Sequence, residues 1–279
     1  MRFTKITTFS LALVVAGSLK AQTVTLAVQP GQKYKVETSV KTNTSAEVMG
    51  QSMVSEFDLK TTTSYEVKSS GQDGTQLVST ITGMKVTGSS MGQEFSYDSD
   101  KKDNSGPIVE AVGGRINKPR NITLDAKGVI TKQDETEGGA GIMMGMADAN
   151  SSSVELFVPA ISGRTLKVGD SFVDVSSMKK DKYSSRDSGT YTVTAIDNGV
   201  ASISYSGTQI VSAVMEQMGM ELNTNSTNTV KTEMQVDITS GVVLLRATVI
   251  DVNSTVEAAG MSIPATGKTI STSTITPVK

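Results

Sequence analysis

A long hairpin pattern between Lys35 and Val67 constrains the fold of this chain more than any other feature. On both flanks of its centre, apolar and polar residues alternate with the period of two that is typical of a half-buried β-strand. The alternating apolar residues are Tyr34, Val36 and Val40 before the centre and Phe57, Leu59, Tyr65 and Val67 after it. Gly50 lies where the chain must reverse, and glycine permits the positive φ of a tight turn. The pattern predicts two long antiparallel strands.

Two other stretches, 64–83 and 190–207, repeat each other. Each has a Tyr-centred run, then an Asp-Gly or Asn-Gly dipeptide, then a second apolar run that closes at glycine. These dipeptides between alternating runs are strong hairpin signals. A second pair of similar segments is 124–130 and 236–243, in each of which an aspartate is followed a few residues later by Gly-Val. These repeated segments predict two β-rich halves related by duplication.

The predicted fold class is all-β, with two related antiparallel curved sheets or half-barrels. The first half spans 23–134 and the second 159–279, and a Gly/Met-rich connector with one marginal helix spans 135–158. Only 37% of residues are hydrophobic and 4% aromatic, which indicates a thin core spread along sheets. Residues 242–252 are apolar on both faces and are predicted to form the most buried strand. The Ser/Thr-rich residues 268–276 are predicted to form an edge strand.

The first 22 residues have the features of a secretory signal peptide. Arg2 and Lys5 precede an apolar run over 9–19 that is too short to span a bilayer. We therefore expect export to the periplasm, the extracellular space or the cell surface. The sequence contains no cysteine, which excludes a lipid anchor, disulfides and thiol catalysis. No later segment predicts a transmembrane helix.

Charge and residue content exclude several function classes. Without Arg2, Lys5 and Lys20 of the leader, 23 basic residues face 28 acidic ones, a poor balance for binding nucleic acid. The absence of histidine removes Ser-His-Asp catalysis and the main ligand of zinc and copper(II) sites. We therefore expect no catalytic residue, no metal and no cofactor, and classify the protein as a non-enzyme.

Two weak motifs have simpler explanations. Residues 88–92 match the G-x-S-x-G nucleophile elbow, but no base accompanies them, and a hairpin tip explains them better. Asp98, Asp100, Asp103 and Asn104 offer hard oxygen ligands for Ca²⁺, but Lys101 and Lys102 interrupt the pattern and the EF-hand glycine and glutamate are missing. A solvated loop is the expectation there.

Methionines gather at predicted turns, often beside glycine. If hairpins bring these turns to one rim, the thioethers form a soft apolar lip that adapts to varied hydrophobic ligands. The candidate ligand-binding residues are Met49, Met53, Met91, Met218, Met220 and Met261. Two alternatives stay open: thioethers bind Cu(I), and flexible methionines also fill gaps in a core poor in aromatics.

Several turn and strand motifs together resemble a secreted, β-rich family of the Bacteroidota, a domain of unknown function. They are 49–53, 95–99, 124–129, 157–159, 168–172 and 260–264. The resemblance covers nearly the whole mature chain and implies export and an all-β body. The chain departs from the family in its Gly-rich stretch 138–145 and in Phe172, where the family commonly has tryptophan.

The sequence favours an exported protein whose curved sheets bind an apolar ligand such as a lipid or lipopeptide. The alternative is a structural or interaction module of the envelope that pairs its Thr-rich edge strands with another chain. An outer-membrane barrel is disfavoured because aromatic girdles are missing. The protein partner is left open.

Overall fold

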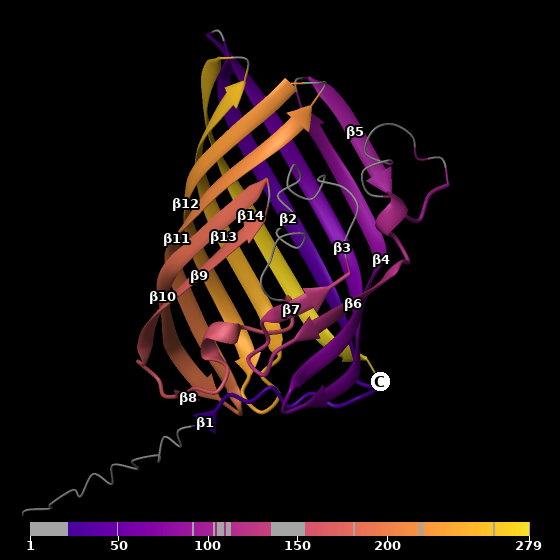
Figure 1. Ribbon diagram of the computed structural model, residues 1–279, viewed down its shortest axis with the longest axis vertical. Helices are drawn as coiled ribbons and strands as arrows, with labels where there is room; N and C mark the ends of the chain where they lie inside the picture. Colours follow the sequence, from indigo (N-terminus) through magenta and orange to yellow (C-terminus); the bar gives the residue numbers. More distant parts are fainter. Residues whose placement is uncertain are drawn as a thin grey trace, which may run out of the picture.

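The computed structural model describes residues 22–48, 50–90, 92–102, 104, 109, 113–134, 154–180, 182–217, 220–258 and 260–278. Most of its strands belong to one antiparallel sheet of 12 strands that curves strongly without closing (Figure 1). The all-β prediction is confirmed. The two predicted halves share this single sheet, because the last strand, β14, pairs with β2. Their limits at 134 and 159 stay predictions.

The sheet order is β7-β6-β4-β3-β2-β14-β13-β12-β11-β10-β9, and β5 pairs with β4 beside β6. Its strands are β2 (Lys33–Val48), β3 (Gln51–Gly71), β4 (Gly74–Ser90), β5 (Gln93–Asp98), β6 (Pro119–Leu124), β7 (Ile130–Gln133), β9 (Ser171–Lys180), β10 (Tyr183–Asp197), β11 (Val200–Gln217), β12 (Met220–Asp237), β13 (Val243–Ala258) and β14 (Met261–Val278). A separate pair joins β1 (Gln22–Thr23) to β8 (Thr165–Leu166). Short 3-10 turns are η1 (Gly113–Arg115) and η3 (Pro159–Ile161).

The predicted hairpins form where turn residues permit them. Gly50, between β2 and β3, has a φ of 78°. Asn198 and Gly199 have φ of 49° and 80°, the signs that a two-residue type I′ turn requires, and they join β10 to β11. The β3–β4 turn lies between Gly71 and Gly74, one residue before the predicted Asp-Gly dipeptide.

The predicted C-terminal edge strand is wrong, because β14 lies in the interior of the sheet between β2 and β13. Its hydroxyl groups are satisfied by neighbouring strands. Thr42 and Thr269 are joined by a hydrogen bond of 3.0 Å between their Oγ1 atoms, and Thr38 and Ser273 by one of 2.9 Å. A hydroxyl-rich strand therefore fits the interior when its partner is equally rich in hydroxyls.

The prediction that 242–252 is the most buried strand is also wrong. Val242, just before β13, and Val243, its first residue, are buried, but the rest of β13 is half-buried or exposed. The sheet forms a single curved layer, so the convex face has no second layer to cover it. Apolar residues on both faces of β13 therefore stay partly open to solvent.

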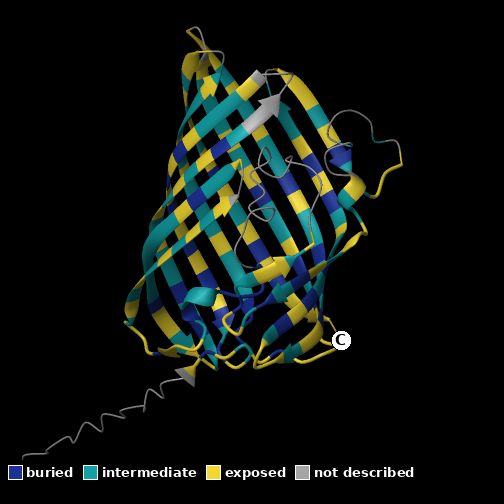
Figure 2. Cartoon of the chain, viewed as in Figure 1, coloured by how far each residue is buried: buried dark blue, intermediate teal, exposed yellow. Residues whose placement is uncertain are grey.

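The main core fills one end of the concave face. Leu77 on β4 and Val193 on β10 belong to one cluster although their strands lie far apart in the sheet. Side chains of such distant strands can meet only on the inner side of a curved sheet. Leu156, Phe157 and Ile161 from the segment that contains η3 are at most 1% exposed and complete this cluster. Figure 2 shows the buried residues concentrated at this end, with alternating stripes of burial along the strands beyond it.

The two halves repeat each other in hydrogen bonding. In the first, Gly31 N donates to Val67 O at 2.8 Å and Val67 N donates to Gln32 O at 2.9 Å. The same pair of bonds recurs at the same lengths in the second, from Gly169 N to Val193 O and from Val193 N to Asp170 O. These matched bonds support the duplication, which stays a prediction.

Candidate binding face

Alternate residues of the long strands point to the concave face, and two patches there carry aromatic side chains. We call Phe57, Leu59, Val86, Phe95 and Tyr97 on β3–β5 the apolar patch. We call Phe172, Asp174, Asp187, Tyr191 and Tyr205 on β9–β11 the tyrosine patch. The strands that carry them lie toward opposite ends of the sheet order, and the curvature turns their inner faces toward a common interior (Figure 1).

The apolar patch belongs to a second hydrophobic cluster, separate from the main core. Leu59, Val86 and Tyr97 are buried in it, whereas Phe57 and Phe95 at its border are half-buried. The centroids of these two phenylalanine rings lie 5.0 Å apart. A Cβ on Gly88 would come within 2.6 Å of the Phe95 ring, so this ring rests on bare backbone. The patch presents aromatic surface at its border.

In the tyrosine patch, strand register places three rings in a row. Tyr191 on β10 pairs directly with Phe172 on β9 and with Tyr205 on β11. Ring centroids are 5.4 Å apart for Phe172 and Tyr191, which stack, and 4.7 Å apart for Tyr191 and Tyr205. The guanidinium carbon of Arg164 lies 4.2 Å from the Phe172 ring centroid, in a cation–π arrangement. Arg164 therefore packs against the ring at the Phe172 end of this row.

Two glycines allow the Tyr205 ring to lie flat across the sheet. A Cβ on Gly189 would come within 2.5 Å of the ring, and a Cβ on Gly207 within 2.4 Å of the Tyr205 hydroxyl oxygen. Gly189 and Gly207 are direct cross-strand partners, so together they clear one continuous floor beneath the ring. One ring face rests on this floor, and the other faces the concave side.

A row of polar side chains runs beside the rings across β10, β11 and β12. Asp187 Oδ1 accepts a hydrogen bond from Gln209 Nε2 at 2.9 Å, and Gln209 Oε1 accepts one from Asn228 Nδ2 at 3.1 Å. The Ser226 hydroxyl completes the row by donating to Asn228 Oδ1. Asn228 and Ser226 are buried. These hydrogen bonds orient the Asp187 carboxylate through the neutral side-chain amide of Gln209.

The titration behaviour of the tyrosine patch reflects burial near carboxylates. Burial raises the pKa of Asp187, and the hydrogen bond from Gln209 offsets part of this rise. Burial raises the pKa of Tyr191 to about 12, against a lowering by Arg246. The pKa of Tyr205 is raised by burial and then by the negative charges of Asp187 and Asp174. Perturbed groups gathered on a concave surface mark a candidate functional site.

Replacing Asp187 by Asn is expected to stabilise the protein at neutral pH. The pKa of Asp187 is raised in the folded state, so the folded protein holds the carboxyl proton more tightly than the unfolded chain does. The stability that this proton contributes is therefore full below the unfolded-state pKa and is lost as pH rises through the folded-state pKa. The amide removes the buried charge and can still accept from Gln209. Urea unfolding of both proteins from pH 3 to pH 8 should show a gain for the variant that grows with pH.

Asp98 supplies the control of opposite sign. A hydrogen bond from the backbone N–H of Asp100 lowers the pKa of Asp98, and Lys85 lowers it further. The Asp98→Asn variant should therefore be less stable than the wild type at neutral pH, and the difference should vanish as pH falls through the lowered pKa. A pH-independent effect of Asp187→Asn would contradict the burial of its charge.

Few of the methionines proposed as a rim lie in the described part of the chain. Met49, Met91 and Met218 fall outside it, and so does the side chain of Met220. Met53 is half-buried and Met261 is 44% exposed, and both alternate onto the concave side near hairpin ends. Residues 1–21 of the predicted signal peptide and residues 135–153 of the connector also lie outside the described residues. The rim and its Cu(I) alternative stay predictions.

The two weak motifs have structural explanations. Residues 88–90 end β4 and pair with β5, so the motif lies at a hairpin as expected; Met91 is outside the described residues. In the aspartate loop, the Lys85 ammonium lies 3.3 Å from both Asp98 Oδ2 and Asp100 Oδ2. Asn104 closes the loop by donating to the carbonyls of Asp98 and Lys101, at 2.7 and 2.8 Å. A lysine thus lies between the carboxylates proposed as Ca²⁺ ligands; Asp103 is outside the described residues.

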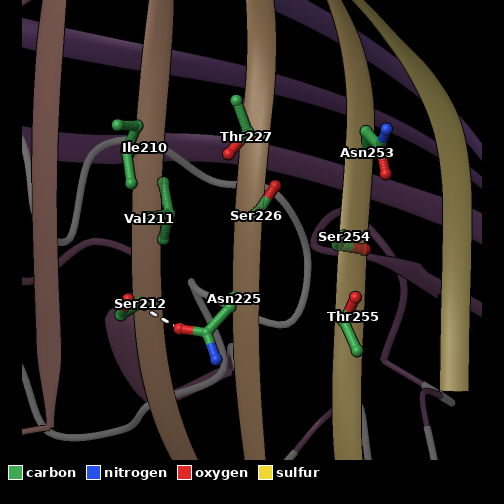
Figure 3. A pocket seen from close by; sticks show the side chains of 9 residues that line it. All are labelled: Ile210, Val211, Ser212, Asn225, Ser226, Thr227, Asn253, Ser254 and Thr255. Atoms are coloured by element: carbon green, nitrogen blue, oxygen red, sulfur yellow. Dashed lines mark hydrogen bonds between the residues drawn. The ribbon is translucent and has the colours of Figure 1, made fainter. Parts of the chain in front are cut away.

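The convex face carries a polar groove of about 310 Å³ across β11–β13 (Figure 3). It is lined by Ile210, Val211, Ser212, Asn225, Ser226, Thr227, Asn253, Ser254 and Thr255. The β12–β13 ladder is interrupted here, since the register resumes only at Thr229 after Ser226. Ser212 Oγ donates to Asn225 Oδ1 at 2.8 Å. The lining is uncharged, so it offers hydrogen bonds but no acid–base chemistry.

A larger groove of about 870 Å³ crosses β14 and β2–β5, and its lining combines Phe57, Gly88 and Phe95 at the apolar patch with charged side chains. Two of these, Lys41 and Asp58, form an ion pair of 3.3 Å, and Lys268 pairs with Asp251 at 2.7 Å. Lys41, Asp58 and Lys268 therefore already have partners, and we place the candidate site at the aromatic side chains of the concave face.

Sequence reasoning missed the tyrosine patch, although its signal is present. Gly189 and Tyr191, and likewise Tyr205 and Gly207, are two residues apart and therefore share a face of their strands. An aromatic beside a same-face glycine indicates a ring lying over backbone. Asp187, two residues from Gly189, joins the same face.

In the described residues, no helix is long and apolar enough to cross a membrane. No protein-family model and no curated protein matches the chain. Similar solved structures include OccK7 (OpdD) of Pseudomonas aeruginosa (8% identity, 89% of this chain and 99% of that chain, TM-score 0.27). Another is DynF of Micromonospora chersina, with 8% identity over 97% of this chain and 92% of that chain and a TM-score of 0.22. A third is an outer membrane channel of Pseudomonas putida F1, with 7% identity over 95% of this chain and 100% of that chain and a TM-score of 0.25. Likeness at such TM-scores carries no argument about function.

Proposed function

We propose that the protein is an exported, non-enzymatic binding protein that holds an amphipathic ligand along the concave face of its sheet. One observation carries the proposal: a single curved surface presents half-buried aromatic rings on β3 and β5 and hydrogen-bonding groups on β10–β14. A ligand site that combines apolar walls with a few placed polar groups has this character.

The hydroxyl-rich middle of the sheet makes a wholly apolar ligand a poor match. Thr232 and Thr248 share a hydrogen bond of 2.9 Å between their Oγ1 atoms, and the Thr38 hydroxyl donates to Glu155 Oε1 at 3.0 Å. Covering such groups with hydrocarbon removes water without replacing its hydrogen bonds. The lipid or lipopeptide expected from the sequence therefore becomes, in this proposal, an amphiphile with its tail at the apolar patch.

Replacing Phe57 by Ser is expected to weaken binding of the neutral amphiphile decyl maltoside by up to about tenfold, because the ligand would cover the exposed part of this half-buried ring, and full burial of a phenylalanine contributes about 1.5–3 kcal/mol. Val54 lies three residues earlier on β3, on the convex face, and is 48% exposed. Val54→Ser is the matched control and should leave the affinity within about twofold. Isothermal titration below the micelle concentration measures both. The proposal fails if the wild type shows no binding, or if both variants lose affinity equally.

Strand addition to another chain is the second candidate. The edge that supports it is β9, which pairs on one side with β10 and exposes Val173 by 66% and Val175 by 51%. Lys179 and Lys180 end this strand, and lysines on an edge oppose such pairing. We therefore rank strand addition below binding at the concave face.

A further inference from the structure

We propose that the tyrosine patch binds an organic ammonium group, so that the amphiphile of the proposed function carries a cationic head. The inference rests on that proposed function and names the chemistry of one end of its ligand. It is carried by the flat Tyr205 ring on its glycine floor together with the two carboxylates that flank this ring.

The Tyr205 ring offers an electron-rich surface in a fixed orientation. Its lower face rests on Gly189 and Gly207, so the ring cannot tilt into the sheet. Tyr191, with its ring centroid 4.7 Å away and its plane inclined by 46°, provides a second wall. Aromatic rings set at an angle in this way attract ammonium groups through their quadrupoles.

Two carboxylates lie beside this ring. Asp174 is the direct cross-strand partner of Gly189, the residue that the ring covers, and Asp187 lies two residues from Gly189 on the same face. None of the ion pairs between described residues involves Asp174 or Asp187. Asp187 accepts a hydrogen bond from the neutral amide of Gln209. The local charge therefore complements a cation.

Of the protein's own cations in this region, Arg164 lies at the Phe172 end of the row, whereas Arg246 is carried by β13, beyond β12 from Tyr205. Arg164 is placed over Phe172, and the Arg246 guanidinium donates from Nη2 to the Phe157 carbonyl at 3.3 Å. Arg246 lowers the pKa of Tyr191, whereas the charges that act on Tyr205 are the carboxylates of Asp187 and Asp174. An ammonium group thus fits at Tyr205 rather than at Phe172.

The test compares three amphiphiles with the same decyl tail: decyltrimethylammonium, neutral decyl maltoside and anionic decyl sulfate. We expect the wild type to bind the cation about tenfold more tightly than the maltoside. Tyr205→Ala and Asp187→Asn should each remove most of this preference, while Tyr205→Phe should retain it because the ring face remains. Thermal melts establish that each variant is folded, and Tyr205→Phe and Asp187→Asn preserve shape if Tyr205→Ala does not fold.

The control variant is Asp251→Asn, which removes the same charge from the convex face, where Asp251 pairs with Lys268. It should leave the preference unchanged. Equal affinity of the wild type for the cation and the maltoside would overturn the ammonium site and leave the proposed function standing. Loss of preference in Asp251→Asn equal to that in Asp187→Asn would also overturn it, because net charge alone would then explain the result. Binding of the cation without the maltoside would support the site and contradict the apolar patch.

Discussion

Replacing Gly74 by Ala is expected to lower the free energy of unfolding by at least about 3 kcal/mol, the size reserved for severe backbone conflicts. A Cβ at this position would lie 1.9 Å from the carbonyl oxygen of Leu124, which belongs to the neighbouring strand β6. Gly74 also has a φ of 123°, a conformation that a residue with a Cβ rarely adopts. Neither conflict can be relieved by a side-chain rotation, so the β4–β6 pairing must shift.

Gly71 provides the control within the same turn, because it is the direct cross-strand partner of Gly74. Its φ lies outside the left-handed region, and an added Cβ would meet no atom within 4 Å. Gly71→Ala should therefore change the free energy of unfolding by less than about 0.5 kcal/mol. Urea unfolding of the two variants beside the wild type makes the comparison. Similar stabilities for Gly74→Ala and Gly71→Ala would show that β6 does not pack against the β3–β4 turn.

The sequence predicted the hairpins well because their signals are local. Alternation over Lys35–Val67 and the Asn198-Gly199 dipeptide depend on neighbouring residues only, and both correspond to strands and turns in the structure. The order of strands in a sheet depends on contacts between residues far apart in the chain. The central place of β14 is such a case, since Thr269 is satisfied by Thr42, 227 residues away.

The candidate site was harder to predict than the fold. The methionine hypothesis used composition at turns, and only Met53 and Met261 of its residues have described side chains. The tyrosine patch depends on cross-strand register, which brings Phe172, Tyr191 and Tyr205 together from three strands. A one-residue change in register would turn one of these rings to the other face. Sequence alone does not fix that register.

Replacing Phe157 by Ala is expected to lower the free energy of unfolding by about 3–5 kcal/mol. Phe157 is 1% exposed and lies in the main core, which residues of both halves build. It also lies against the Gly128 turn, where an added Cβ would be 3.3 Å from its own Cβ. Its carbonyl accepts from Arg246 of β13, and the neighbouring Leu156 carbonyl accepts from Val243 N at 2.8 Å. Truncation would leave a cavity between the two halves.

Two further variants make the Phe157 result specific to packing. Phe157→Leu keeps most of the apolar volume and should cost less than about 1.5 kcal/mol. Val173→Ala on the edge strand β9, where Val173 is 66% exposed, should cost less than about 0.5 kcal/mol. Urea unfolding measures the three variants together. A loss below about 1 kcal/mol for Phe157→Ala would contradict the core described here, because a site that tolerates such truncation must be able to collapse or to admit water. In that event the segment carrying Leu156 and Phe157 could not be what joins the two halves across the concave face.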